Sequence, residues 1–369
     1  EEGKYYLWTR EQFDAALSEP EARLAKRAFG LEKPSNFEDR AWHLWLPETS
    51  TDGNEGKQND EGKQNDESKQ SDEGKQNDET AVLARARAKL LEARERRVAP
   101  GRDEKLLVSW NGLMIRGMAK AARRLGRPDL AASAARAVDF IRANLWRDGR
   151  LCATYKDGRA RLAGYLDDYA FLADGLLELL EQRWRTEDLE LAIALTDVVL
   201  AHFEDASGGF FFTADDHEKL IHRPKPWLDE AVPSGNAVML RVLLKLGALL
   251  GERRYEESAE RGLKAALPTT GQYPDAHAAL MLALARYLEP PEIIVVRAEA
   301  GELPSWRAIV DAGYAPRRSA YCIPNDAPRL PGLLADRAPR GAAVAYVCLG
   351  TECRAPITEL EQLRSALSR

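Results

Sequence analysis

The stretch Gly164–Phe171 carries the side chains best suited to do chemistry. It reads Gly-Tyr-Leu-Asp-Asp-Tyr-Ala-Phe, so two adjacent carboxylates stand at the start of a long apolar segment. Two carboxyl groups can act as acid and base on a glycosidic bond when they face each other across the sugar, about 5–9.5 Å apart. Asp167 and Asp168 would point about 100° apart on a helix, so they do not form that pair with each other. One of them is expected to cap the helix and the other to face a ligand.

A second carboxylate would have to come from another loop. Asp229 and Glu230 precede the turn at 233–236 and are the best placed, followed by Asp103. The alternative is that the two adjacent aspartates only stabilise a helix start, where a carboxylate accepts hydrogen bonds from free N–H groups. The catalytic candidates are Asp167, Asp168, Asp229 and Glu230.

Aromatic and amide side chains accompany the same helix starts. Flat rings pack on the apolar faces of sugars and amides bind hydroxyl groups, although most such side chains belong to the core or to helix caps. We expect two of the five aromatic candidates to contact a ligand. Ser234 lacks the Gly-x-Ser-x-Gly context of a serine nucleophile. The substrate-binding candidates are Trp110, Asn111, Tyr165, Tyr169, Phe211, Trp227, Ser234 and Asn236.

Neither a metal nor a cofactor is predicted. His202, His217 and His222 lie near Asp215 and Asp216, but a loop supplies no fixed ligand geometry. No Gly-x-Gly-x-x-Gly follows the strand-like run at 292–296, so no nucleotide site is inferred. The predicted inner-helix starts also lack the histidine base that an epimerase usually needs.

The elements that would position these residues alternate in character. Strongly apolar helices open on the motifs above, recur about 60 residues apart, and are each followed by an amphipathic helix. Tight links follow the apolar helices, whereas the returns at 147–165 and 205–233 are long and contain strand-like runs at 150–155 and 209–213. An inner ring of helices inside an outer ring, an α/α toroid, explains this pattern, with the inner helices starting around a funnel; a plain helical solenoid is the alternative. The apolar helices are expected at 109–125, 166–183 and 234–250, and their partners at 129–146, 187–204 and 252–267.

The flanking segments divide the chain into four parts. Residues 1–50 are expected to form an N-terminal part of the toroid, with short strands at 5–8 and 42–46 and a helix from Thr9, capped by Gln12, to about Phe29. Residues 51–79 include four polar hexapeptides and are expected to be disordered. Residues 80–289 should form the helical hairpins, starting with a basic helix at 80–98. Strands alternating with helices predict a small α/β subdomain, with partly parallel pairing, at 290–369.

Bulk composition excludes several classes. The 369 residues carry a net charge of −6 with no basic face for nucleic acid, and no apolar run is long enough for a membrane helix. Four cysteines favour a reducing, cytoplasmic compartment, with Cys348 and Cys353 as ordinary thiols. The chain starts at Glu1 without Met, which suggests a fragment. The oligomeric state is not predicted.

Several motifs in order resemble a known family. They are Trp8, Ser109-Trp110-Asn111-Gly112-Leu113, Leu166-Asp167-Asp168-Tyr169-Ala170, Gly209-Phe210-Phe211-Phe212-Thr213, Pro233-Ser234-Gly235-Asn236, and the tail from Tyr346 through Pro356. With them the chain resembles the thioredoxin-domain-containing, spermatogenesis-associated family. That resemblance implies an N-terminal thioredoxin-like domain followed by a six-hairpin, glycosidase-like toroid. By this resemblance the sequence begins after the thioredoxin-like domain and the first toroid helices, so an incomplete ring of helices is expected.

The expected fold is therefore mainly α, an incomplete α/α toroid with a small C-terminal α/β subdomain. The expected function is that of a carbohydrate-binding or carbohydrate-active toroid of undefined reaction, with a sugar-like small molecule as partner and neither nucleic acid nor membrane. Two alternatives remain open: a non-catalytic binding module, and a scaffold whose role depends on the thioredoxin-like domain. Family resemblance to sugar epimerases and glycosidases is one of fold, which does not transfer chemistry.

Overall fold

The computed structural model describes residues 3–46, 66–289, 291–350 and 352–368, with the backbone alone for 66–77. The chain divides into two units, Glu1–Asp103 and Glu104–Arg369, which are described separately.

The first unit is a small helical cluster. It contains β1 (Leu7–Trp8), α1 (Arg10–Ala16), α2 (Glu19–Ala28), β2 (Trp42–His43) and α3 (Asp66–Glu95). The predicted capping box at Thr9 and Gln12 is confirmed. The single helix predicted to reach Phe29 is wrong, because a second helix begins after Ser18, whose N–H donates to the Glu21 carboxylate. Ala86 and Leu90 of α3 pack against Trp8 and Phe13. Residues 80–95 therefore lie with the N-terminal segment, not with the hairpins.

The polar insert departs from its prediction in part. Residues 51–65 lie outside the described residues, but α3 begins at Asp66, so the expectation of disorder is wrong for 66–79. The repeats contain Glu, Lys and Gln, which have good helix propensity, and no proline. Once the apolar stretch after Thr80 has packed, extending its helix backwards avoids a new nucleation step.

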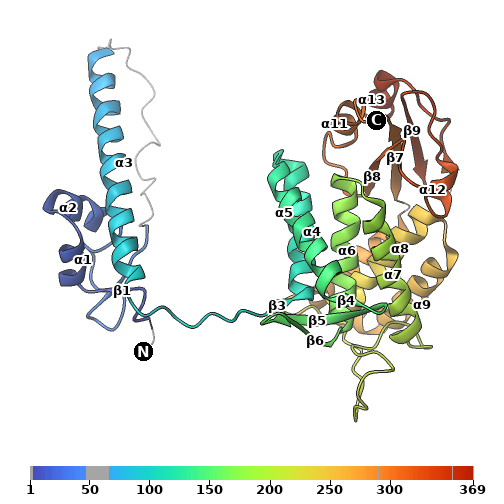
Figure 1. Ribbon diagram of the computed structural model, residues 1–369, viewed down its shortest axis with the longest axis horizontal. Helices are drawn as coiled ribbons and strands as arrows, with labels where there is room; N and C mark the ends of the chain where they lie inside the picture. The colour runs from blue at the N-terminus through green and yellow to red at the C-terminus, as the bar shows by residue number, and fades with distance from the viewer. Residues whose placement is uncertain (1–2, 47–65, 290, 351, 369) are drawn as a thin grey trace. The chain divides into compact units, whose positions relative to one another are not determined.

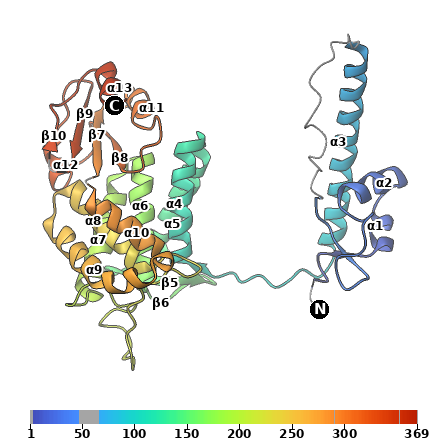
Figure 2. The same ribbon diagram turned by 180° about the vertical axis from the view of Figure 1, so that it is seen from behind.

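The second unit begins with helical hairpins (Figures 1 and 2). Consecutive helices pair α4 with α5, α6 with α7 and α8 with α9, while α4, α6, α8 and α10 also contact one another in that order. The predicted alternation of inner and outer helices is confirmed, and α6 is buried along nearly its whole length. Among the described residues, no helix combines the length and apolarity needed to span a bilayer. The helices are α4 (Val108–Leu125), α5 (Pro128–Asn144), α6 (Leu166–Gln182), α7 (Thr186–His202), α8 (Gly235–Leu250), α9 (Arg253–Gln272), the 3-10 turn η1 (Pro274–His277) and α10 (Ala278–Leu288).

One return connection forms a sheet and the other does not. β5 (Arg150–Lys156) pairs with β3 (Leu106–Leu107), β4 (Trp146–Arg147) and β6 (Arg159–Ala163), all antiparallel. The strand predicted at 209–213 is wrong, since Phe210 makes only an isolated bridge to Glu204. Gly208 and Gly209 both have positive φ, which breaks an extended run there. The long returns therefore differ in structure.

The C-terminal subdomain is a mixed sheet covered on both faces. β7 (Glu292–Ala298) pairs parallel with β8 (Arg318–Pro324) and antiparallel with β9 (Ala343–Leu349), so the predicted partly parallel pairing is confirmed. Alternate residues point to opposite faces: Ile293 and Val295 pack on the helical hairpins, and Ile294 and Val296 pack under α11 (Leu303–Val310) and α13 (Leu360–Leu367). Burial on both faces explains the unbroken apolar run of β7.

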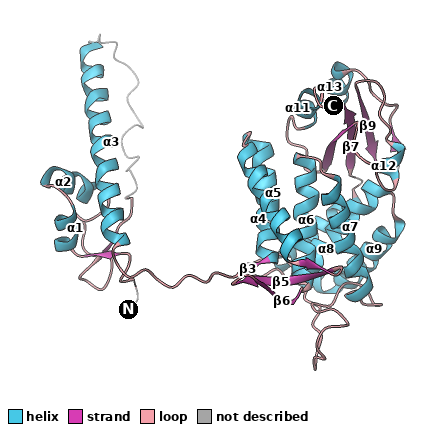
Figure 3. Cartoon of the chain, viewed as in Figure 1, coloured by secondary structure: helices cyan, strands magenta, loops and turns pink. Residues whose placement is uncertain are grey.

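The two sheets of this unit lie at opposite ends of its helices (Figure 3). The sheet of β3–β6 lies where the inner helices begin, because β3 runs directly into α4 and β6 precedes α6. The C-terminal sheet, with the short α12 (Leu333–Asp336) beside α8, lies at the other end. The fold is mainly α, an incomplete α/α toroid with a small C-terminal α/β subdomain, as predicted.

The prediction of two ordinary thiols near the C-terminus is wrong. Cys348 of β9 and Cys353 of β10 (Glu352–Cys353) form a disulfide. The two strands make a tight hairpin in which these residues are direct cross-strand partners. Their spacing fits neither a redox helix nor a zinc knuckle, but a tight hairpin brings the two residues opposite each other.

We expect two free thiols, Cys152 and Cys322, when the protein is unfolded without reductant. Reduction should raise the count to four, the total number of cysteines. Ellman titration in guanidinium, before and after a phosphine reductant, measures this. Cys152→Ser should lower both counts by one. Four thiols in the untreated protein would contradict the disulfide.

Candidate functional site

Asp168 joins the starts of two inner helices. Its Oδ2 accepts a hydrogen bond from the Tyr165 N–H at 2.9 Å, and its Oδ1 accepts one from the Ser109 N–H, also at 2.9 Å. Free N–H groups at helix starts need such acceptors, and a carboxylate suits the positive end of the helix dipole. Burial raises the pKa of Asp168 to about 6, although the two N–H groups act in the opposite direction. Both oxygens are therefore committed to holding α6 against α4.

Asp167 is placed differently. It and Gln182 are the residues of α6 that are not fully buried. Its carboxylate lies over Gly235, the first residue of α8, where a Cβ atom would collide with Oδ1. Within the described chain no hydrogen bond reaches this carboxylate. Burial, followed by the charge of Asp168, raises the pKa of Asp167 to about 6. Asp167 is thus the open carboxyl group of the pair.

Asp229 continues the same pattern of acid-to-backbone contacts. Its Oδ1 accepts the Ser234 N–H at 2.9 Å, before α8, and its Oδ2 accepts the Ala279 N–H at 2.7 Å, in the first turn of α10. The side chain of Glu230 is exposed. Of the four catalytic candidates, two therefore fasten neighbouring helix starts through both carboxylate oxygens.

The polar binding candidates act mainly as structural braces. Asn236 is fully buried: its Oδ1 accepts the Phe210 N–H at 2.7 Å, and its amide donates to the carbonyls of Phe210 and Pro226. Ser234 caps α8 and donates to Pro226. Asn111 donates to the Leu107 carbonyl one turn back. These contacts hold the loops rather than offer groups to a ligand.

The aromatic candidates separate into packed and open rings. Tyr169 is in the core and its hydroxyl accepts the Leu151 N–H. Tyr165 stacks on Phe212 with ring centroids 5.0 Å apart. Phe211 lies under the Arg223 guanidinium, and Trp227 packs against Gly209. Trp110, in the first turn of α4, is 64% exposed and is the open ring of the five.

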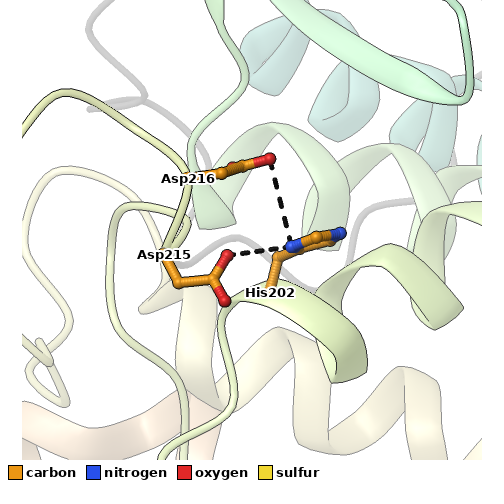
Figure 4. A group of neighbouring side chains, drawn as sticks. All are labelled: His202, Asp215 and Asp216. Atoms are coloured by element: carbon orange, nitrogen blue, oxygen red, sulfur yellow. Dashed lines mark hydrogen bonds and ion pairs between the residues drawn. The ribbon is translucent and has the colours of Figure 1, made fainter.

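The candidate metal ligands form a charge cluster (Figure 4). His202 Nδ1 lies 2.8 Å from Asp215 Oδ1 and 4.0 Å from Asp216 Oδ2. Arg150 already pairs with both oxygens of Asp216, at 2.7 and 2.6 Å. A hydrogen bond from His202 lowers the pKa of Asp215. Ion pairing accounts for this arrangement, and the absence of a metal stays a prediction.

One charged cluster was not predicted from the sequence. Asp174, Glu178 and Glu181 are nearly fully buried on α6 and pair with basic side chains of α4 and α8. Their spacing of four and then three residues places them on one face of the helix. Three acids on one face of an otherwise apolar helix were the signal that could have revealed it.

Paired helices whose inner members start side by side define an α/α toroid protein. No protein-family model matches the chain. Human spermatogenesis-associated protein 20 is 28% identical over 396 residues, which cover 99% of this chain and 49% of the human protein. The rat protein of the same name is 27% identical over 397 residues, covering 100% of this chain and 49% of its own length.

The predicted resemblance to the thioredoxin-domain-containing, spermatogenesis-associated family is confirmed by these relatives. The chain spans about half the length of the curated relatives it matches. A solved cellobiose 2-epimerase from Spirochaeta thermophila is similar with a TM-score of 0.38 and 16% identity, over 44% of this chain and 43% of that one. A likeness this distant does not decide a reaction, which has to be argued from the residues.

Proposed function

We propose that the start of the inner helices α4, α6 and α8 binds a sugar-like small molecule, and that the Asp167 carboxyl group forms hydrogen bonds with its hydroxyl groups. The observation that carries this proposal is the state of Asp167: a half-buried carboxyl group that has no hydrogen-bond partner in the described chain and a pKa raised to about 6. A titratable group with a shifted pKa at a helix start is a frequent mark of a functional site. Trp110 supplies an exposed ring on the neighbouring helix start.

Binding is favoured over two-carboxylate hydrolysis. A glycosidase needs an acid and a second carboxylate free to act on the sugar or on water. Asp168 and Asp229 both use their two oxygens on backbone N–H groups. Of the four catalytic candidates, Glu230 is the one left as a second acid, and its side chain is exposed. One open acid with one open aromatic ring suits a binding module.

The protonation state of Asp167 should control the affinity. Above pH 6 the carboxylate accepts hydrogen bonds from sugar hydroxyls, and below pH 6 the protonated group also donates one. A charged acceptor binds hydroxyl groups more strongly than a neutral one. The affinity for a neutral sugar is therefore expected to rise as the pH increases through about 6.

We expect Asp167→Asn to weaken sugar binding about tenfold at pH 7.5, since one charge-assisted hydrogen bond contributes about 1.5 kcal/mol. The variant should also lose the pH dependence near 6. A thermal-shift screen with mono- and oligosaccharides would find the ligand, and calorimetry at pH 5 and 7.5 would measure its affinity. Asp129→Asn is the matched control, because Asp129 also lies in the first turn of a helix but pairs with Arg127 at the surface.

Two results would argue against this proposal. The first is a folded protein that no saccharide stabilises. The second is equal affinity in Asp167→Asn, Trp110→Ala and the unchanged protein. If Glu230→Gln abolished hydrolysis of a bound oligosaccharide, the carbohydrate-active alternative would replace simple binding.

A further inference from the structure

A concave site lies further along the same inner helices. A cavity of about 660 Å³ is lined by α4, α6, α8, α10, the segment 314–317 and the first two residues of β8. Nine of its side chains are basic and three are glutamates. Arg116 and Arg123 of α4 are eight and fifteen residues beyond Val108, which is about 12 to 22 Å at the usual helical rise. The cavity is therefore separate from Asp167.

Buried carboxylates on α6 neutralise part of this charge. Asp174 pairs with Arg116 at 2.7 Å and with Arg241 at 2.6 Å. Glu181 pairs with Arg123 at 2.8 Å and with Lys245 at 3.2 Å.

The remaining cations of the inner helices share one carboxylate, and two arginines at the rim have partners of their own. Glu178 serves Arg123 at 2.9 Å and lies 3.6 Å from both Lys120 and Lys245. At the rim, Arg317 pairs with Glu289 and Arg318 with Glu292. Three carboxylates of α6 thus form ion pairs with five cations of α4 and α8, so the positive charge is in excess.

Two cations of the lining have no carboxylate partner in the described chain. Arg124 donates instead to the backbone carbonyls of Asp311 and Gly313, whereas Arg286 of α10 has no such substitute. Within the described chain no carboxylate comes within ion-pair distance of it; its Nη2 donates to Ser319 Oγ at 3.3 Å, and its buried Nε has no hydrogen-bond partner. Burial lowers the pKa of Arg286, but a guanidinium stays charged in a protein. A half-buried cation without a counter-ion is unfavourable. An anion bound in the cavity would supply the counter-charge that Arg286 lacks among the described residues.

We propose that this cavity binds a phosphate-bearing small molecule, with Arg286 and Lys120 as its principal counter-charges. The volume falls in the range of small-ligand sites. Basic groups approach from α4, α8 and α10, and a tetrahedral phosphate with three acceptor oxygens can meet several of them, whereas a carboxylate offers two oxygens in one plane. The source can be free inorganic phosphate, a polyphosphate or a phosphate ester, which share this chemistry.

Calorimetric titration of the whole chain with inorganic phosphate, pyrophosphate and glycerol phosphate tests the proposal. Pyrophosphate is expected to bind most tightly if the cavity takes a polyphosphate, and glycerol phosphate if it takes an ester. Neutral glycerol should not bind. Affinity should fall as salt is raised, because the contacts are ionic. Asp167→Asn should leave anion binding unchanged, so failure at the sugar site does not affect this result.

Variants decide which residues are responsible. Arg286→Gln is expected to weaken binding at least tenfold and Lys120→Gln several-fold. Arg253→Gln is the matched control, since Arg253 is 86% exposed and pairs with Glu257 of its own helix. Absence of binding with all three anions at millimolar concentration would overturn the proposal, as would affinities unaffected by both variants. If Arg286→Gln does not fold, Lys120→Gln is the deciding variant, because Lys120 is half exposed. An unchanged anion affinity in Lys120→Gln would then overturn the proposal.

Discussion

Replacing Asp174 by alanine is expected to destabilise the helical unit by about 3–5 kcal/mol, the usual cost of removing one partner from a buried ion pair. Asp174 is 1% exposed and its Oδ2 faces Arg116 and Arg241 from the two helices on either side of α6. Without the carboxylate, the guanidinium groups of Arg116 and Arg241, 31% and 12% exposed, lose the charge that they share. Helices α4 and α8 would then present like charges to each other across α6.

Urea denaturation at pH 7, in a buffer free of phosphate, measures this change. The matched control is Asp139→Ala. Asp139 also pairs with two arginines, Arg142 and Arg185, but is about half exposed, so its loss should cost below about 1 kcal/mol. Equal destabilisation by the two variants would show that burial of the Asp174 pair has no energetic consequence.

The pH dependence of the Asp174 contribution follows from the direction of its shift. Burial by itself raises the pKa of Asp174, but the charges of Arg241 and Arg116 outweigh it and hold the pKa well below the ordinary value of 3.8. A group with a depressed folded-state pKa stabilises the protein above its unfolded-state pKa, and that stability is lost as the pH falls. The difference in the free energy of unfolding between Asp174→Ala and the unchanged protein should therefore be largest at pH 6–7 and should decrease below about pH 4.

Helix positions were predictable because their signals are local. The apolar helix expected at 166–183 is found at Leu166–Gln182, and the one expected at 234–250 is found at Gly235–Leu250. Gly251 ends the latter with a φ of 72°, in the left-handed region that glycine adopts at helix ends. Periodicity, caps and glycine stops act within a few residues, so one sequence is sufficient to read them.

The roles of the two aspartates were not predictable from the same information. Their angular separation on α6 follows from helix geometry. Which of the two carboxylates is buried depends on the hydrogen bond from the Ser109 N–H, which lies 59 residues earlier. The cationic cavity depends in the same way on the axial positions of four helices. Such features require the tertiary arrangement. The pairing of Cys348 with Cys353 depends only on the short hairpin between them, which makes the two residues cross-strand partners.

The closest approach of α4 and α6 depends on two glycines. A Cβ atom at Gly112 would lie 2.5 Å from the Phe171 carbonyl carbon and 2.6 Å from the Leu172 nitrogen, and one at Gly175 would lie 2.7 Å from the Gly112 oxygen. These neighbours are backbone atoms of a buried helix, so they cannot rotate away as a flexible side chain would. Any side chain at position 112 must push the two helices apart.

We therefore expect Gly112→Ala to cost about 1–3 kcal/mol from overpacking, even though alanine is the better helix former by up to about 1 kcal/mol. The matched control is Gly117→Ala in the same helix, because Gly117 is exposed and a Cβ there meets nothing within 4 Å. That change should stabilise the protein by about 0.5–1 kcal/mol, so the two substitutions are predicted to have opposite signs in urea denaturation.

The same displacement should reach the candidate site. Gly112 lies one turn beyond Ser109, whose N–H binds Asp168 at 2.9 Å, so separating α4 from α6 lengthens that hydrogen bond and moves Trp110 away from Asp167. Sugar binding should weaken in Gly112→Ala and remain unchanged in Gly117→Ala. Destabilisation of similar size in both variants would mean that helix propensity, and not the close contact with Phe171, governs this interface.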